Sequence, residues 1–331
     1  MIDIKRGRYV EPIADWWLDA VIKFLAEPHN AYIVLGTKRK CFKSYYRKLE
    51  YICLSVVFKK FRDKRLKRAC IAQLNYWWQH LDEIILAKPD AMAAQVKVWM
   101  NKKIGQKKLL EALSPVFVVY YDLVSDALGK DLVEKLNIKT CPYCNRQFLY
   151  TFKGRSSERP ELDHFFPKSV FPLYCLSFYN LIPACHSCNH VKSNDLIGVN
   201  PYQGPFDRRF VITDKNGNKL SKSKIFKLTE KEIRLAFDGR NLDEEKNDCV
   251  LGLNDVYNKH KDYVKELVDK SMAYDKNARE VLVTSFQGAG FHPRQVYDFV
   301  WGRYLMDAQY EDRPLSKLTK DILDLLDIRR G

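Results

Sequence analysis

The sequence predicts a mostly α-helical protein with one small α+β module in its middle. Three observations support this fold class. Apolar residues recur at helical spacing over residues 11–135 and again from Glu230 to the end. Two Cys-x-x-Cys pairs enclose a region whose sequence favours short strands and turns. A polar turn signal at residues 215–218 separates two short runs that are rich in β-branched and aromatic residues.

We therefore expect three regions along the chain: a helical, basic domain at 1–138, a small α+β module at 139–205, and a β-hairpin followed by helices at 206–331. The helices expected in the first region cover residues 11–27, 43–62, 65–86, 91–103 and 109–128. Pro115 is expected to start, bend or split the last of these, and Gly129 to cap it. The hairpin is expected to pair residues 210–213 with residues 224–228.

The formal charge of +15 favours an anionic partner. The excess is concentrated, because residues 38–68 contain thirteen Lys or Arg against two acids. Nucleic acid is the favoured polyanion, since cations that neutralise phosphates release counterions, and an anionic membrane surface is the weaker option. The candidate contacts in this stretch are Lys59, Lys60, Arg62 and Arg65. The alternative is a pair of amphipathic helices whose solvated faces happen to be Lys-rich.

The apolar runs of the sequence are shorter than the roughly 18 residues that a membrane span needs. The first six residues, MIDIKR, contain no apolar segment typical of a secretory signal. We therefore expect a cytoplasmic protein with no membrane partner.

Nine cysteines are present, and four of them form the two close pairs, Cys141 with Cys144 and Cys185 with Cys188. Two such pairs supply the four soft ligands that tetrahedral zinc prefers, and a closed site of four thiolates is structural rather than catalytic. Buried or redox-active thiols are the alternative interpretation. The remaining cysteines are expected to be small core residues: Cys41, Cys53, Cys70, Cys175 and Cys249.

Two segments within this module carry residues suited to phosphodiester chemistry. Residues 161–169 read ELDHFFPKS, and residues 180–194 read NLIPACHSCNHVKSN. Asp-His at the end of one strand, Asn-Leu opening the next, and Cys-x-x-Cys-Asn-x-x-Lys starting a helix resemble the HNH (ββα-metal) endonuclease family in its zinc-knuckle form. The resemblance covers about 55 residues.

Hydrolysis of a phosphodiester needs an activated water, and a neutral imidazole such as that of His164 is suited to accept its proton near neutral pH. The resemblance further implies that Asp163 and Asn189 bind the catalytic metal and that Asn180 braces the loop that orients His164. A carboxylate and an amide oxygen suit Mg²⁺ or Mn²⁺. The family name expects His where this chain has Asn189, a variant that resembles the HNH domain of RNA-guided DNA-cleaving effectors.

Several neighbouring side chains are open to more than one interpretation. Lys168 and Lys192 could each hold a phosphate, or could be ordinary solvated lysines. If a helix begins near His186, then His186, Asn189 and His190 share one face, and either histidine could add an imidazole to the metal site. The whole block could instead be a zinc-containing module that binds nucleic acid without cutting it, or an HNH toxin that cleaves RNA or tRNA.

Patterns outside the module suggest a biological setting. Residues 251–261, residues 313–323 and the opening residues 4–12 resemble HNH proteins of bacterial defence islands, in particular the Septu-type and retron-associated nucleases. The resemblance implies an endonuclease of double-stranded DNA in anti-phage defence, alongside a partner ATPase.

Overall fold

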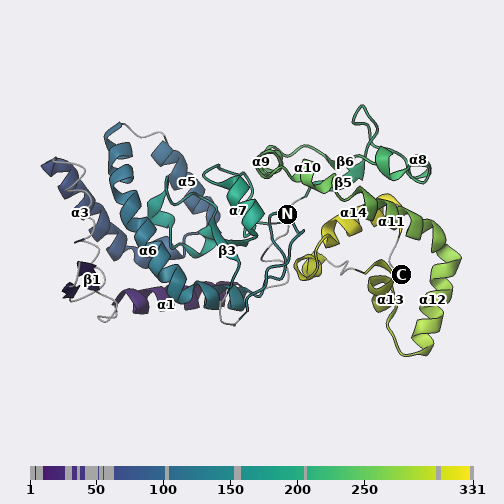
Figure 1. The fold of residues 1–331 in the computed structure, drawn as a ribbon, viewed down its shortest axis with the longest axis horizontal. Coiled ribbons are helices and arrows are strands. Elements are labelled where there is room, and N and C mark those ends of the chain that lie inside the picture. The colour runs from purple at the N-terminus through teal and green to yellow at the C-terminus, as the bar shows by residue number, and fades with distance from the viewer. Residues whose placement is uncertain are drawn as a thin grey trace. The chain divides into compact units, whose positions relative to one another are not determined.

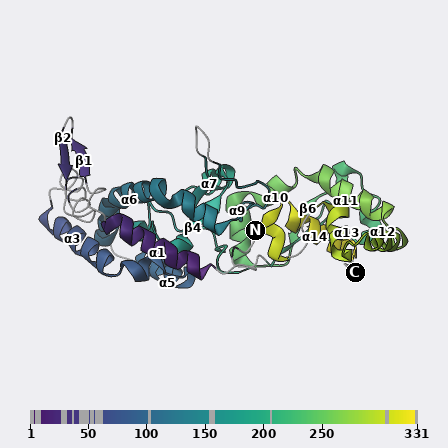
Figure 2. The same cartoon turned by 90° about the horizontal axis from the view of Figure 1, so that it is seen from below.

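The computed structural model describes residues 4, 10–26, 32–35, 38–41, 51, 55, 63–100, 104–152, 158–204, 207–302 and 307–328. This part of the chain is mostly helical, with short antiparallel two-stranded sheets, as the sequence predicts (Figures 1 and 2). It divides into two compact units. We call Arg8–Asn137 with Tyr150–Leu196 the site unit, and Met1–Gly7, Ile138–Leu149 and Ile197–Gly331 the C-terminal unit.

The site unit is built on one long helix, α6 (Ile104–Leu136), against which helices α1 and α3 pack. Its described elements are α1 (Glu11–Ala26), β1 (Tyr32–Leu35), β2 (Lys38–Cys41), α3 (Lys64–Gln79), α4 (Leu81–Ile85), α5 (Pro89–Met100), α6, β3 (Glu161–His164), η2 (Pro172–Tyr174), η3 (Phe178–Asn180), β4 (Leu181–Ala184) and α7 (His186–Lys192). The apolar face of α1 is buried at Trp17, Val21 and Leu25, which confirms the predicted helix.

Helix α6 runs further than the sequence predicts. Pro115 lies inside it without splitting it, because the helical turn that follows is anchored by the fully buried Val116, Phe117 and Tyr120. Gly129 also lies inside the helix, so its predicted role as a cap is wrong. The turn comes after Leu136, where Asn137 has a positive φ of 47° and its N–H bonds back to Val133.

Residues 32–35 and 38–41 fall within the region predicted to be helical and instead form an antiparallel strand pair, with Tyr32 opposite Cys41 and Leu35 opposite Lys38. The physical reason is local, since Tyr-Ile-Val-Leu is a continuous apolar run with a β-branched centre and no helical period. The predicted helix at 43–62 lies outside the described residues apart from Tyr51 and Ser55.

The loop segment 171–180, between β3 and β4, is tied to the helices of the site unit. Trp17 of α1 donates its indole N–H to the carbonyl of Leu176 at 2.9 Å, and Trp77 of α3 donates to the carbonyl of Leu173 at 3.1 Å. Both indoles are buried, and Trp77 meets Phe117 and Tyr120 edge to face. The hydroxyl of Ser177 donates to the carbonyl of Ile84 at 2.6 Å. The helices therefore fix the path of this loop.

The C-terminal unit is a separate set of short elements. They are β5 (Arg209–Ile212), α8 (Lys222–Ile225), η4 (Glu230–Glu232), β6 (Leu235–Asp238), α9 (Leu242–Leu251), α10 (Leu253–Tyr257), α11 (Lys261–Ala273), α12 (Lys276–Gly288), α13 (Pro293–Trp301), η5 (Asp307–Asp312) and α14 (Ser316–Leu325). The helical period after Glu230 predicts seven core residues, and all but Val256 are buried; Val256 is half-buried. The buried six are Leu251, Leu253, Tyr257, Val264, Leu267 and Val268. Helix α14 packs on β5 and α11.

The predicted hairpin is wrong in its second strand. The turn at 215–218 forms, with Gly217 at a φ of 83° and Asp214 accepting backbone bonds from Asn216 and Asn218. After the turn, the returning chain forms a β-bridge between Lys219 and Thr213 but no second strand, because helix α8 begins after Ser221. Strand β5 pairs instead with β6 at 235–238, inside the stretch expected to be wholly helical.

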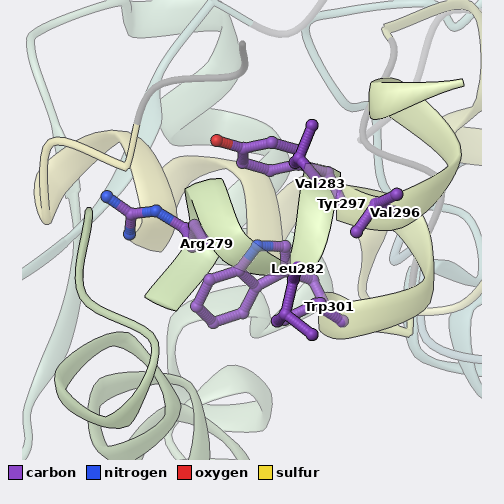
Figure 3. Close-up of a pocket in the computed structure, with 7 residues that line it drawn as sticks. Arg279, Leu282, Val283, Val296, Tyr297 and Trp301 are labelled. Atoms are coloured by element: carbon purple, nitrogen blue, oxygen red, sulfur yellow. The ribbon is translucent and has the colours of Figure 1, made fainter. Parts of the chain in front are cut away.

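Helices α12 and α13 form a helical pair in the C-terminal unit (Figure 3). Leu282 and Val283 of α12 lie opposite Val296, Tyr297 and Trp301 of α13, around a cavity of about 10 Å³. A void of that size has room for about one water molecule. The cavity is therefore a packing feature, too small for a ligand.

The first Cys-x-x-Cys segment is held by the end of the chain. Asn145 follows it with a φ of 46° and is fully buried. Its side-chain amide donates to Thr140 and to the carbonyls of Tyr310 and Arg313, at 3.0, 2.8 and 3.2 Å, and accepts from the N–H of Lys317 at 3.2 Å. This one amide thereby joins the segment to the start of α14.

Removal of one indole N–H should loosen the site unit measurably. Trp77→Phe keeps an aromatic ring against Phe117 but leaves the buried carbonyl of Leu173 without its donor. We expect a loss of about 1–3 kcal/mol in the free energy of unfolding, measured with urea. Tyr76→Phe, at the half-exposed neighbour on the same helix, should stay within about 0.5 kcal/mol of wild type. Equal effects of the two substitutions would contradict the anchoring role of Trp77.

Candidate active site and four-cysteine cluster

Strands β3 and β4 and helix α7 form a small ββα arrangement in the site unit. The strands are antiparallel, with Asp163 opposite Ile182 and His164 opposite Leu181. Helix α7 starts at His186, directly after β4, with Cys185 as its N-cap residue. A cleft of about 570 Å³ is lined by residues of β3, α7 and α6, and it includes Asp163, His164 and Asn189. The structure thus places these three predicted site residues around one cavity.

His164 is buried, and its ring orientation is set by a backbone carbonyl. Its Nε2 lies 3.0 Å from the carbonyl oxygen of Cys175, and its ring meets Tyr121 edge-on at 4.3 Å. A carbonyl oxygen only accepts hydrogen bonds, so we assign the ring proton to Nε2. Nδ1 is then the basic nitrogen of the neutral ring.

The environment of His164 strongly favours its neutral form. Burial, together with the nearby charges of Lys168 and Lys192, lowers the pKa of His164 to about 3. The expectation of a ring that titrates near neutral pH is therefore wrong for the protein without substrate. The approach of an anionic phosphate would act in the opposite direction, because a negative charge favours the imidazolium.

Asp163 and Lys192 form a buried ion pair. The Lys192 ammonium lies 3.2 Å from Oδ2 and 3.3 Å from Oδ1 of Asp163, and it donates to the carbonyl of His164 at 2.7 Å. Lys192 is completely buried, so the interpretation as a solvated lysine is wrong, and its ammonium is engaged within the protein rather than presented to a phosphate. Its bonds hold the end of β3, where Asp163 and His164 must be brought to one site.

Glu161 is a site residue that the sequence reasoning missed. Its Oε1 accepts from Nδ1 of His186 at 2.8 Å, and its Oε2 accepts from Nδ2 of Asn189 at 2.7 Å. Burial acts to raise the pKa of Glu161, but these two bonds outweigh it and lower the pKa. The same contact raises the pKa of His186. The signal was available, because residues two apart on a strand, here Glu161 and Asp163, share a face.

Asn180 is fully buried and closes the loop between the strands. Its Oδ1 accepts from the N–H of Phe166 at 2.7 Å, while its Nδ2 donates to the carbonyls of Phe166 and Tyr174 at 3.1 and 2.9 Å. The amide therefore joins both ends of the loop that carries the Cys175 carbonyl. This position suits the bracing role that the family resemblance implies.

Helix α6 and the two residues that precede β3 also contribute polar groups to the lining of the cleft, namely Ser125 and Arg159. The sequence reasoning missed both. Arg159 donates to Ser125 Oγ at 2.6 Å and to the carbonyl of Pro160 at 3.0 Å. Its guanidinium lies over Gly129, where an added Cβ would come within 3.1 Å of it. Glycine at this helical position therefore makes room for the arginine.

The structure describes only some of the predicted nucleic-acid contacts. Lys168 lines the cleft, but it pairs with Asp122 at 3.1 Å and lies over the Tyr121 ring at 4.1 Å. Arg65 is exposed in the first turn of α3. The remaining predicted contacts, Lys59, Lys60 and Arg62, lie outside the described residues.

The histidines of α7 share a face, as the sequence predicts for a helix that begins near position 186. The rings of His186 and His190 stack with centroids 5.8 Å apart. Within the described residues, the groups of His, Cys, Asp and Glu that could hold a metal ion comprise the four-cysteine cluster alone. Neither histidine therefore completes such a group with the carboxylates of the cleft.

The four paired cysteines form the cluster that the sequence predicts. Cys141, Cys144, Cys185 and Cys188 are buried, and their sulfur atoms all lie within 4.8 Å of one another. Tetrahedral zinc with bonds of about 2.3 Å places its sulfur ligands about 3.8 Å apart. The cluster is thus suited to a structural metal such as zinc, and four thiolates leave no open position for a substrate.

The five other cysteines behave less uniformly than predicted. Cys70 and Cys175 are buried, whereas Cys249 is exposed, so its assignment to the core is wrong. Its place on α9 turns the thiol away from the packed side of that helix. The Cys41 side chain and all of Cys53 lie outside the described residues.

The comparisons with known proteins identify no relative. No protein-family model, no curated protein and no solved structure matches the chain. Among the helices of the described ranges, none combines the length and the apolar character that crossing a membrane requires. The properties of the site therefore rest on its own residues.

Elemental analysis should find about one zinc per chain. Cys144→Ser or Cys188→Ser should lose that zinc, because three sulfur ligands hold the ion less tightly. Cys249→Ser is the matched control and should keep it, since this cysteine is exposed and lies outside the cluster. Chelation should unfold the cysteine module and leave the helical signal of residues 11–27 in place. A folded, reduced wild-type protein without zinc would rule the metal site out.

Lys192→Met should destabilise the site unit by about 3–5 kcal/mol, because it leaves the buried Asp163 carboxylate without its ammonium. The double variant Asp163→Asn with Lys192→Met should be more stable than Lys192→Met alone, as measured by chemical denaturation. Lys168→Met removes a partly exposed pair and should cost about 1 kcal/mol or less. A double variant no more stable than Lys192→Met would show that the pair is not coupled.

Proposed function

We propose that the chain is a metal-dependent endonuclease of the HNH type that hydrolyses phosphodiester bonds in DNA. The observation that carries the proposal is the geometry of His164. The Nε2–H group of His164 donates a hydrogen bond to the Cys175 carbonyl, which leaves Nδ1 as the basic nitrogen, and the ring lines the same cleft as Asp163 and Asn189. A neutral, oriented imidazole beside two oxygen ligands is the arrangement that water activation requires.

The donor set fits a hard divalent ion. Asp163 offers carboxylate oxygens and Asn189 an amide oxygen, and ligands of this kind suit Mg²⁺ or Mn²⁺. Once bound, the ion supplies positive charge for the scissile phosphate and the leaving oxygen. Lys192 moderates the charge of the site, since its ammonium offsets one carboxylate.

The chain's own residues account for the proton transfer. His164 Nδ1 accepts a proton from water as the water oxygen bonds to phosphorus. The bond from phosphorus to the 3′ oxygen breaks, and the 3′ oxygen leaves with the electron pair and takes up a proton from solvent water. The products are a 5′-phosphate and a 3′-hydroxyl. Asn180 keeps the loop closed, so that the Cys175 carbonyl continues to orient the imidazole.

DNA is the proposed polyanion because the chain carries a formal charge of +15 and because Arg65 extends a strongly basic stretch. A role in cytoplasmic anti-phage defence with a partner ATPase is part of the same proposal. It rests on the sequence patterns at both ends of the chain.

A plasmid-nicking assay with Mg²⁺ tests the proposal. His164→Ala should reduce the nicking rate about 100-fold or more, because the proton acceptor is lost. His80→Ala is the matched control, at a partly exposed histidine on the helical side of the unit, and should keep wild-type activity. Zinc content and circular dichroism confirm that each variant is folded.

The same assay separates the alternatives. Equal behaviour of wild type and His164→Ala, with DNA still bound, would indicate a non-catalytic binding protein. When DNA and RNA of matched sequence are compared, DNA should be cut faster. Preferential cleavage of RNA would overturn the DNA assignment. The assay is repeated with any partner ATPase encoded beside the protein, so that inactivity of the isolated chain is not misread.

A further inference from the structure

The amide of Asn189 can serve a metal only in one of its two orientations. An asparagine side chain presents either Oδ1 or Nδ2 in a given direction, and only the oxygen can bind a cation. Asn189 lies in the short helix α7 and lines the cleft with Asp163. Something in the protein must therefore select the orientation in which Oδ1 is left for the cleft.

We propose that Glu161 is a positioning residue that selects this orientation. Its Oε2 accepts a hydrogen bond from Nδ2 of Asn189 at 2.7 Å. A carboxylate only accepts hydrogen bonds, so this contact fixes which end of the amide faces Glu161 and leaves Oδ1 at the other end. Among the described residues, none donates a hydrogen bond to that Oδ1. The inference rests on the proposed function, because it concerns the same metal.

Glu161 is itself held in place for this task. It opens β3 opposite Ala184, the last residue of β4 before the Cys185 knuckle and α7. Its other oxygen accepts from His186 Nδ1 at 2.8 Å, in the first turn of α7. Both carboxylate oxygens of Glu161 are thus engaged by His186 and Asn189 of α7. Asp163 is paired instead with Lys192, the last residue of the same helix.

Mn²⁺ binding followed by electron paramagnetic resonance measures the effect without depending on catalysis. The zinc-loaded full chain is titrated with Mn²⁺ alone. In Glu161→Gln, the new amide can offer Asn189 either its oxygen or its NH₂ group, so the single orientation is lost. We expect Mn²⁺ affinity to fall about tenfold, a change typical when a residue that orients a metal ligand is replaced.

Two comparisons separate orientation from simple charge. Glu161→Asp keeps the charge but shortens the side chain by one methylene, so it should also weaken Mn²⁺ binding. The double variant Glu161→Gln with Asn189→Asp reverses the polarity of the contact, because the new carboxylate accepts from the new NH₂ group and presents its second oxygen to the cleft. Glu161→Ala with Asn189→Asp has the same net charge but no donor at position 161.

We expect the Gln–Asp double variant to bind Mn²⁺ about tenfold more tightly than the Ala–Asp double variant, and to recover part of the nicking activity. Equal affinity of these two variants, together with wild-type affinity in Glu161→Asp, would show that Glu161 acts by charge alone and would overturn the inference. Wild type that binds no Mn²⁺ and does not cut would instead overturn the proposed function, and the inference with it.

Discussion

The geometry of the cleft depends on which side chains donate hydrogen bonds to the backbone carbonyls of segment 171–180. Buried carbonyl groups need partners, and here the partners come from outside the segment. The indoles of Trp17 and Trp77 hold carbonyls on the two sides of Cys175, and the carbonyl of Cys175 itself receives His164. The helices of the site unit thus help to orient the His164 ring, although they lie far from His164 in the sequence. Helices α1 and α3 and the ring are connected through hydrogen bonds to three nearby carbonyls of one loop.

A second constraint is the balance of charge inside the cleft. Asp163 is buried with Lys192, and Asp122 is partnered by Lys168. A buried carboxylate without a cation would be protonated or would open the structure to water. Each of these two carboxylates of the cleft therefore has a lysine ammonium within 3.2 Å. The same arrangement explains why the ring of His164 is held neutral, since cations surround it in a buried setting.

Much of the candidate site could be predicted from sequence because its determinants are local. The spacing of the cysteine pairs, the Asp163–His164 step and the start of α7 depend on short-range geometry, and the structure has each of them in the expected element. What the sequence could not reveal depends on distant packing. Lys192 looks like any helix lysine until β3 is placed beside it, and its burial follows from that contact.

The partner of β5 was unpredictable for the same reason. The turn at 215–218 forms locally, but the pairing of Phe210 with Phe237 spans 27 positions. Asp321 of α14 accepts the backbone N–H of Phe210 at 3.0 Å, so the last helix helps to hold the strand in place. Patterns of two or four residues carry no information about such a contact.

Asn145 has a consequence for how the protein is made. Its amide joins the first cysteine pair to residues 310–317, which are 165 to 172 positions further along the chain. Ribosomes deliver residues in order, so those partners emerge only after at least 165 further residues have been synthesised. Until then, of its partners among the described residues, the side chain of Asn145 has only Thr140, in its own segment. The hydrogen bonds that complete this segment therefore form late in the synthesis of the chain.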